Sequence, residues 1–311
     1  MKLKLKSIIT AAITALGVIM LPFSANAADT VNKTIAVSTA EELSSITGNG
    51  TYCIYNDIDL EGFDWKGISD FSGTLYAYSD CVIKNMNSDD CGLFRKLSSG
   101  AKIQNIHLEN VNIKTKTKML GGLVSYIPAS SKGVEVVDCS VNGSVCTRFQ
   151  GSSTLNYCGG IAGVVSAKDC VISGCSSSAI VGSPDRQGGI VGLNYGNISD
   201  CVFTGCVKNS ENFSPEDSEE EWLDLYTVSQ ATGGITSVNV GSISNCVVLL
   251  SDCGSATYLG LVSGVNITGK GKINNCIALK ADKWTRDGDS ENISEIANNV
   301  KSKDLTFKLK S

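Results

Sequence analysis

The sequence has little proline, little charge and a single histidine. Four prolines stand against 32 glycines, and charged residues make up 18% of the 311 positions. Hydrophobic residues make up 42%, which argues against a disordered chain. A composition with much glycine and little proline suits short strands joined by tight turns. The length is sufficient for one or two ordinary domains or for a single elongated repeat array.

Long apolar runs are absent except near the N-terminus. There, a start with three lysines precedes the apolar run Ile8–Leu21, and Ala25-Asn26-Ala27 is a small-residue cleavage site. These features predict a secretory signal over residues 1–27. A membrane anchor is the alternative, but the run is short and no stop-transfer charges follow it. We therefore expect a secreted or surface-associated protein whose mature chain has no membrane span.

A surplus of basic residues is also missing. Without the three lysines of the signal, 23 basic residues remain against 31 acidic ones, and the formal charge is −8. Nucleic acids and anionic membranes attract surfaces that are rich in lysine and arginine. We therefore expect no nucleic-acid partner and no electrostatic attachment to a membrane.

The motifs of common enzymes are missing as well. No Gly-x-Ser-x-Gly elbow, P-loop or dinucleotide fingerprint follows a suitable strand, and no His-Glu-x-x-His is present. The one histidine, His107, alternates with Ile106 and Leu108, which places it on the outer side of a strand. We therefore expect no catalytic residue, no cofactor and no metal ligand.

What the sequence does contain is an internal repeat. Segments such as Asn197-Ile-Ser-Asp-Cys201 recur, each with Asn or Asp before its last residue. Gly-Gly-apolar segments such as Gly188-Gly-Ile-Val191 recur with them. The last positions of the first set form a predicted core column: Met86, Ile106, Cys139, Cys170, Cys201, Cys246 and Cys276.

The repeated segments have the length of strands. Each has about four to six residues, too few for an ordinary helix, and none can bury its apolar side alone. Stacking equivalent strands at about 4.8 Å per coil buries a continuous column. We therefore predict an all-β, right-handed parallel β-helix of about seven coils, with short helical caps at its ends. Asn or Asp suits one corner, and the glycine pairs suit a corner that needs positive φ or close backbone approach.

The repeat also sets the expected boundaries. A leader or N-terminal cap covers residues 28–68, in which Ser38-Thr-Ala-Glu41 is a capping-box pattern that begins a short helix toward Leu43. The β-helix covers residues 69–284. A C-terminal cap and polar tail cover residues 285–311, where four apolar residues have helical spacing: Ile293, Ile296, Ala297 and Val300.

The repeats resemble the GLUG-motif repeats of secreted and surface proteins of bacteria. The segment Gly188–Val207 carries the resemblance most clearly, and Gly159–Ile180 and Gly233–Leu249 are looser copies. The resemblance extends over roughly residues 36–284. It implies a non-catalytic region of the kind that occurs beside protease and adhesin domains, and this sequence shows no catalytic domain of that kind.

The cysteines admit three interpretations. Cys170 with Cys175, and Cys201 with Cys206, are Cys-x4-Cys pairs, which differ from the Cys-x2-Cys spacing usual at zinc sites. Disulfides fit stacked neighbours by distance, but parallel side chains make their torsion awkward. We expect a mainly reduced column, because buried thiols behave as small hydrophobic groups. Two peripheral pairs remain open to oxidation: Cys53/Cys81 and Cys146/Cys158.

An acidic insertion of about fourteen residues lengthens one coil between Asn209 and Asp224. Insertions in repeat proteins often carry binding. Its carboxylates could hold calcium, but they lack the spaced Asp-x-Asn-x-Asp-Gly pattern, so a solvated loop is favoured. The possible binding residues are Glu216, Asp217, Glu219, Glu220, Glu221, Trp222 and Asp224.

Two functions are compatible with these patterns. We expect a non-catalytic, exported, adhesin-like or surface-associated protein that binds glycan or protein through exposed faces and loops. The alternative is a carbohydrate-active enzyme, a polysaccharide lyase or glycoside hydrolase, that uses one β-helix face. Its candidate carboxylates are Asp57 with Asp59 and Asp89 with Asp90, which we interpret as solvated turn residues. A Ser/Asn-lined face favours binding, whereas two convergent carboxylates in a groove favour catalysis.

Overall fold

The structure is a computed structural model that describes residues 34–147, 156–209, 231–250, 252–253 and 258–280. The predicted signal (1–27), nearly all of the acidic insertion and the C-terminal cap (285–311) lie outside the described residues. Within the described ranges, no helix has both the length and the apolar character that crossing a bilayer requires.

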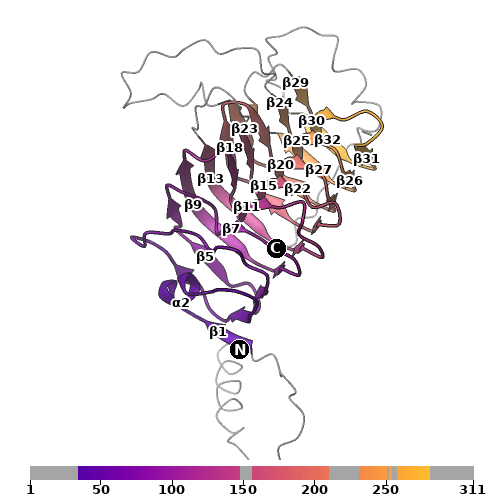
Figure 1. Ribbon diagram of the computed structural model, residues 1–311. Coiled ribbons are helices and arrows are strands. Elements are labelled where there is room, and N and C mark those ends of the chain that lie inside the picture. Colours follow the sequence, from indigo (N-terminus) through magenta and orange to yellow (C-terminus); the bar gives the residue numbers. More distant parts are fainter. Residues whose placement is uncertain (1–33, 148–155, 210–230, 251, 254–257, 281–311) are drawn as a thin grey trace, which may run out of the picture. The chain divides into compact units, whose positions relative to one another are not determined.

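The chain coils through four sheets of short parallel strands, which confirms the predicted β-helix (Figure 1). The nine-stranded sheet contains β1 (Thr34–Val37), β2 (Thr51–Ile54), β4 (Thr74–Ala77), β8 (Lys102–Gln104), β12 (Glu135–Val137), β16 (Val171–Ser173), β21 (Asn197–Ser199), β26 (Ser242–Ser244) and β31 (Lys272–Asn274). The six-stranded sheet contains β7 (Phe94–Lys96), β11 (Val124–Ile127), β15 (Ala162–Val165), β20 (Val191–Asn194), β25 (Thr236–Asn239) and β30 (Ser263–Asn266).

The other two sheets complete each coil. The five-stranded sheet contains β10 (Met119–Gly121), β14 (Tyr157–Gly159), β19 (Arg186–Gly188), β24 (Ala231–Gly233) and β29 (Tyr258–Gly260). The twelve-stranded sheet contains β3 (Ile58–Asp59), β5 (Val82–Lys84), β6 (Asn87–Ser88), β9 (His107–Thr115), β13 (Ser140–Thr147), β17 (Ser176–Ser177), β18 (Ile180–Ser183), β22 (Val202–Phe203), β23 (Cys206–Asn209), β27 (Val247–Leu250), β28 (Asp252–Cys253) and β32 (Ile277–Lys280).

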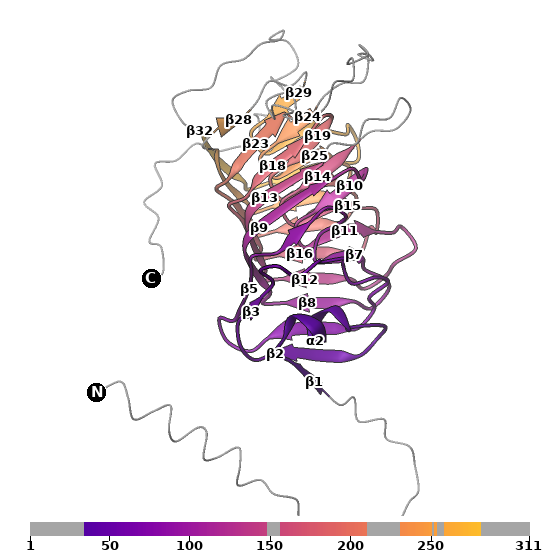
Figure 2. The ribbon, with the colours of Figure 1, turned by 90° about the vertical axis from the view of Figure 1, so that its left-hand side faces the viewer.

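One turn of the chain visits all four sheets. It leaves β16, passes through β17 and β18, then β19, then β20, and returns as β21, which pairs with β16 (Figure 2). Seven strands of the nine-stranded sheet come from residues 69–284, in agreement with about seven coils. The leader adds β1 and β2 to the same sheet, so it extends the stack rather than only closing it.

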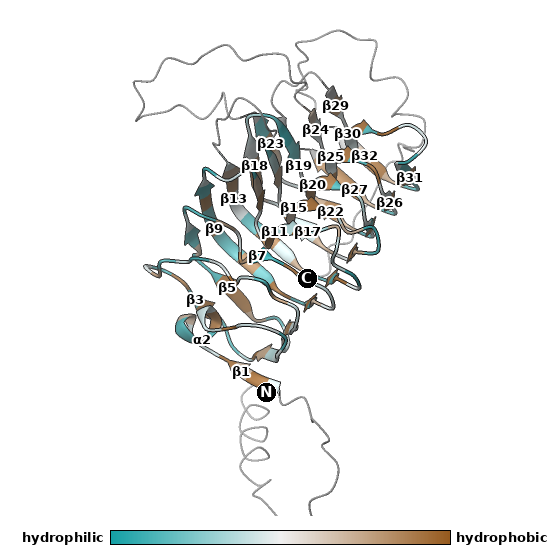
Figure 3. Ribbon diagram, viewed as in Figure 1, coloured by the Kyte–Doolittle hydropathy of each residue, from teal (hydrophilic) through white to brown (hydrophobic). Residues whose placement is uncertain are grey.

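The core follows from the alternation of side chains along each strand. The middle residue of successive strands in the nine-stranded sheet points inward and is buried, which stacks Leu75, Ile103, Val136, Ile172, Ile198, Ile243 and Ile273. Burying one such side chain contributes about 1.5–3 kcal/mol. Hydrophobic and hydrophilic residues accordingly share the same strands in Figure 3.

One corner of the solenoid requires the left-handed backbone conformation. After each of the later strands of the nine-stranded sheet, one residue has a φ between 52° and 63°, and these residues are Asn105, Asp138, Gly174, Asp200, Asn245 and Asn275. Asn and Asp tolerate this region better than other side chains, and glycine has no penalty there. The predicted corner role of Asn and Asp is therefore confirmed.

The glycine pairs serve close approach between coils rather than positive φ. A Cβ added to Gly160 would lie 2.3 Å from the carbonyl oxygen of Gly189, and one added to Gly189 would lie 2.1 Å from that of Gly234. No side chain fits in that space. In the last described coil, Gly233 is in register with Gly260.

Two members of the predicted core column are wrong. Ser173 pairs with both Val137 and Ser199, so the residue that stacks between Cys139 and Cys201 is Cys175, not Cys170. Gly174 takes the corner position that we assigned to an Asp. Met86 belongs to another column, because β5 pairs with β9 in the twelve-stranded sheet. The column is Ile106, Cys139, Cys175, Cys201, Cys246 and Cys276.

The helix α2 (Ala40–Ser44) begins one residue later than the capping-box pattern suggested. Its N-cap is Thr39, whose Oγ1 accepts a hydrogen bond of 3.2 Å from the Glu42 N–H. The Glu42 carboxylate accepts a 2.7 Å bond from the N–H of Ser38, the residue before the N-cap, so the arrangement is a variant of the capping box. Leu43 is fully buried in the main core, so the helix covers apolar side chains at the N-terminal end (Figure 1).

Candidate functional site

The outer face of the nine-stranded sheet is a regular surface to which each described coil adds one strand. Two columns of outward side chains flank its buried column. The first is Thr34, Thr51, Thr74, Lys102, Glu135, Val171, Asn197, Ser242 and Lys272. The second is Ala36, Cys53, Tyr76, Gln104, Val137, Ser173, Ser199, Ser244 and Asn274.

These two columns are mainly hydroxyl and amide groups, and all members except Cys53 are exposed or half-buried. Some of them bond to one another across coils. Ser242 Oγ donates to Asn197 Oδ1 at 2.8 Å, and Lys102 Nζ lies 3.2 Å from Glu135 Oε1. The face therefore offers hydroxyl, amide and ammonium groups at intervals of one coil, about 4.8 Å. Six of the eighteen positions are serine or asparagine, all of them in the coils after β12.

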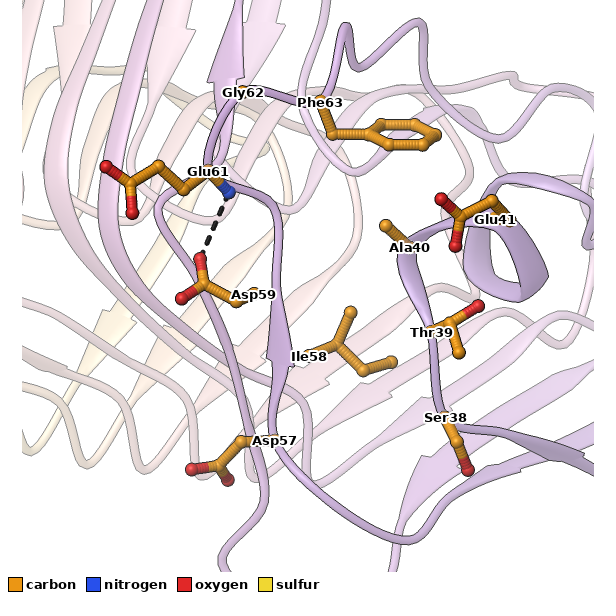
Figure 4. Close-up of a pocket in the computed structure, with 10 residues that line it drawn as sticks. All are labelled: Ser38, Thr39, Ala40, Glu41, Asp57, Ile58, Asp59, Glu61, Gly62 and Phe63. Atoms are coloured by element: carbon orange, nitrogen blue, oxygen red, sulfur yellow. Dashed lines mark hydrogen bonds between the residues drawn. The ribbon is translucent and has the colours of Figure 1, made fainter.

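The carboxylates Asp57 and Asp59 line a hollow of about 370 Å³ beside helix α2 (Figure 4). Asp59 accepts hydrogen bonds from Asn85 Nδ2 at 2.8 Å and from the Glu61 N–H at 3.0 Å. These bonds, followed by Lys84, lower the pKa of Asp59, so it is held as a carboxylate and is a poor proton donor. Asp57 accepts the Val82 N–H at 3.1 Å. Asp57 therefore holds the backbone at Val82, and Asp59 holds the Asn85 side chain and the backbone at Glu61.

The second candidate pair is engaged in ion pairs. Asp89 lies 3.3 Å from Lys66 Nζ. The Asp90 carboxylate accepts hydrogen bonds from both terminal nitrogens of the Arg95 guanidinium, and these bonds raise the pKa of Arg95. The two aspartates are therefore bound to different cations and do not converge on a common point.

His107 lies on β9, half-buried, with both ring nitrogens bonded. Nδ1 is 2.8 Å from Ser140 Oγ, and Nε2 is 2.9 Å from Asn105 Oδ1. His107 therefore links its coil to the neighbouring coil through Ser140 and to the corner through Asn105. It does not face the carboxylates of the hollow, whose lining residues come from positions 38–63.

The cysteine column forms a regular series of buried thiols. Each thiol donates to the carbonyl oxygen two residues earlier, at 3.2–3.4 Å, and the donors are Cys139, Cys175, Cys201, Cys246 and Cys276. No disulfide joins the cysteines whose side chains are described, and this includes both peripheral pairs. In the described part of the chain, no three His, Cys, Asp or Glu side chains form a group suited to a metal ion.

Two tyrosines at the N-terminal end of the solenoid were not singled out by the sequence. Tyr55 and Tyr78 are 50% and 65% exposed, and their ring centroids lie 5.8 Å apart. Each follows a strand of the nine-stranded sheet in neighbouring coils. The available signal was the aligned pattern of Cys53-Ile-Tyr55 and Tyr76-Ala-Tyr78, which becomes visible only once β2 and β4 are paired in register.

The predicted binding loop lies outside the described residues. This applies to Glu216, Asp217, Glu219, Glu220, Glu221, Trp222 and Asp224. The structure therefore tests neither a calcium site nor a partner contact there. The described strands on either side of it are β23, which ends at Asn209, and β24, which begins at Ala231.

Comparison with known proteins adds a similarity of fold. Neither protein-family models nor curated proteins give a match. A crystal structure from Bacteroides ovatus, described as a candidate immunoglobulin A1 protease, matches with a TM-score of 0.57 and 20% identity. The match covers 83% of this chain and 78% of that one. At this identity, the similarity shows a shared β-solenoid fold and no more.

Proposed function

We propose that this protein is a non-catalytic, exported binding protein that holds an extended glycan on the outer face of its nine-stranded sheet. The observation that carries the proposal is the pair of outward columns, which present mainly hydroxyl and amide groups at a constant interval over nine strands. A glycan chain is itself a repeating series of hydroxyl groups. Matching repeats allow many weak hydrogen bonds to add along one direction.

The same proposal includes an exported location and repeats of the GLUG type. Export is supported by the basic start, apolar run and cleavage site within residues 1–27. The GLUG resemblance is supported by the glycine pairs, whose close contact between coils explains why the motif recurs. An adhesin-like or surface-associated role follows from export combined with a long binding face.

The alternative of a carbohydrate-active enzyme would place its chemistry in the hollow with Asp57 and Asp59. The bonds that hold both carboxylates favour binding over that alternative. The description of the structural neighbour suggests a further alternative, a protease. Incubation of the full-length secreted protein with glycans and with immunoglobulin A1, followed by mass spectrometry, separates these cases. We expect no shortened glycan and no antibody fragment.

A glycan array, followed by calorimetric titration of any positive glycan, tests the binding proposal. Ser199→Trp places a bulky ring in the middle of the face, and we expect it to weaken binding at least tenfold. Leu193→Trp is the matched control, because Leu193 is half-buried on the six-stranded sheet. We expect the control to bind like the wild type. Absence of any glycan hit, or equal binding by both variants, would contradict the proposal.

A further inference from the structure

The exposed tyrosine pair is unusual for this chain. Three other aromatic side chains at the same end, Trp65, Phe71 and Phe94, are at most 1% exposed, and Tyr52, Phe63 and Tyr76 are half-buried. Tyr55 and Tyr78 are instead the most exposed large hydrophobic side chains among the described residues. Exposed aromatic surface of this kind is a common mark of a binding site.

The backbone below the two rings is fixed. Tyr55 and Tyr78 occupy matching places in neighbouring coils, because the Tyr78 N–H donates to the Ile54 carbonyl at 2.7 Å. Asn105 Nδ2 then donates to the Ser79 carbonyl at 2.7 Å, and the Cys81 thiol to the Tyr78 carbonyl at 3.0 Å. The backbone positions of the two tyrosines are therefore set before any ligand arrives, which reduces the entropy lost on binding.

One ring of the pair, that of Tyr55, has the thiol of Cys53 as a polar neighbour. Cys53 is fully buried, and its thiol bonds with Tyr55 and Tyr76. These bonds are the first cause of the raised pKa of both phenols, so both stay neutral at ordinary pH. The ring planes of Tyr55 and Tyr78 are inclined by 36°, and the two rings together make a shallow apolar platform. The C–H face of a pyranose ring is complementary to such a platform.

The charge beside the platform restricts the kind of sugar. Asn56 joins the platform to the hollow, because its Nδ2 donates to the Asp57 carbonyl at 2.8 Å and to the Ser38 carbonyl at 3.2 Å. Both of these residues line the hollow. Its lining holds four carboxylates and no lysine or arginine: Glu41, Asp57, Asp59 and Glu61 (Figure 4). A negatively charged sugar would be repelled there, whereas an amine would be attracted.

We infer that Tyr55 and Tyr78 form the stacking site for a neutral or amine-bearing pyranose at the N-terminal end of the binding face. This inference rests on the proposed function, because Tyr55 and Tyr78 each lie two residues after a member of the second outward column, Cys53 and Tyr76. It adds the primary contact and the charge class of the glycan. Uronic acids and sialic acids are excluded by the acidic hollow.

Three oligosaccharides of equal length test the charge class by calorimetry on the full-length secreted protein: cellohexaose, a chitosan hexamer and oligogalacturonate. We expect the chitosan hexamer or cellohexaose to bind at least tenfold more tightly than oligogalacturonate. Salt should weaken binding of the chitosan hexamer more than that of cellohexaose. Equal or tighter binding of the galacturonate would overturn the charge argument.

Substitutions test the platform itself. We expect Tyr55→Ala and Tyr78→Ala each to weaken binding about tenfold or more, and Tyr55→Phe/Tyr78→Phe to retain it because the rings remain. Tyr195→Ala is the matched control, since Tyr195 is 37% exposed on another part of the solenoid. Far-UV circular dichroism confirms that each variant is folded. If both alanine variants bind the glycan as the wild type does, the tyrosine platform is not the stacking site, while the proposed function is unaffected. A wild-type protein that binds no glycan would end both.

Discussion

At the residue scale, the corner after the nine-stranded sheet shows how single side chains direct the coil. Asn245 has a φ of 54°, a conformation that disfavours residues with a Cβ. Its Nδ2 donates to Asp200 Oδ1 at 3.2 Å, and its Oδ1 accepts from Asn275 Nδ2 at 3.0 Å. The residue therefore has two roles: it permits the turn, and it joins three successive coils by hydrogen bonds between its amide, the Asp200 carboxylate and the Asn275 amide.

We predict that Asn245→Ala lowers the free energy of unfolding by about 1–2 kcal/mol, because alanine is strained at positive φ and cannot bridge the coils. Asn245→Gly should cost less, since glycine removes the strain and loses only the ladder bonds. Urea unfolding followed by circular dichroism gives both values. Equal stability of the alanine variant and the wild type would show that the corner is not constrained.

The same corner explains where prediction from sequence succeeded and where it failed. Asn or Asp before the last strand residue correctly located most of the turns. In one coil the residue at this corner is Gly174, so the Gly174-Cys175 pair did not fit the Asn/Asp-Cys pattern. Asp169-Cys170 fitted the pattern but does not lie at the corner. Both residues allow the same φ, and no local signal separates them. The tyrosine platform was missed because it depends on register between coils.

At the element scale, the glycine pairs determine how closely neighbouring coils stack. Gly189 lies on the turn between β19 and β20, where an added Cβ would be 2.1 Å from the Gly234 carbonyl oxygen and 2.4 Å from Phe203 Cγ. The carbonyl belongs to the backbone of the next coil and cannot move alone. Glycine is thus required by space, and the sequence left open whether space or dihedral angle was the reason.

We predict that Gly189→Ala destabilises the fold by about 1–3 kcal/mol or more, because the coils must separate to admit one methyl group. Ser199→Ala is a control on the same coil, since it removes an outward hydroxyl without adding volume. Thermal unfolding compares the two variants with the wild type. A melting temperature unchanged by Gly189→Ala would mean that the coils are less tightly stacked than the structure shows.

At the scale of the whole molecule, the thiol column links five coils through one kind of side chain. Its members follow one another from Cys139 to Cys276, and each thiol bonds to a carbonyl of its own coil. A disulfide between two members would remove both of these donors. The structure therefore favours a reduced column. Such a column would be destabilised by ionisation of its buried thiols.

We predict that stability declines above about pH 9. The pKa of Cys246 is raised from 9.0 to about 12, first by its bond with Cys201 and then by burial, and burial raises that of Cys170 to about 12. Unfolded thiols lose their protons near the lower value, and folded ones do not. The stabilisation is thus complete below pH 9 and falls toward pH 12, by up to about 1.4 kcal/mol per pH unit for each thiol.

Urea unfolding at pH 8, 9 and 10 measures this decline, and Cys246→Ala isolates the share of one thiol because lysines and tyrosines titrate in the same range. The variant should be less stable at pH 8 but lose less stability than the wild type between pH 9 and 10.

Counting thiols with Ellman's reagent in urea supplies the redox control. We expect nearly all of the thirteen cysteines to react after unfolding and few before it, because the column opens only with the coils themselves. Two or fewer reactive thiols in urea would show that the column is oxidised, and a variant with the wild-type pH slope would show that the buried thiols do not resist ionisation.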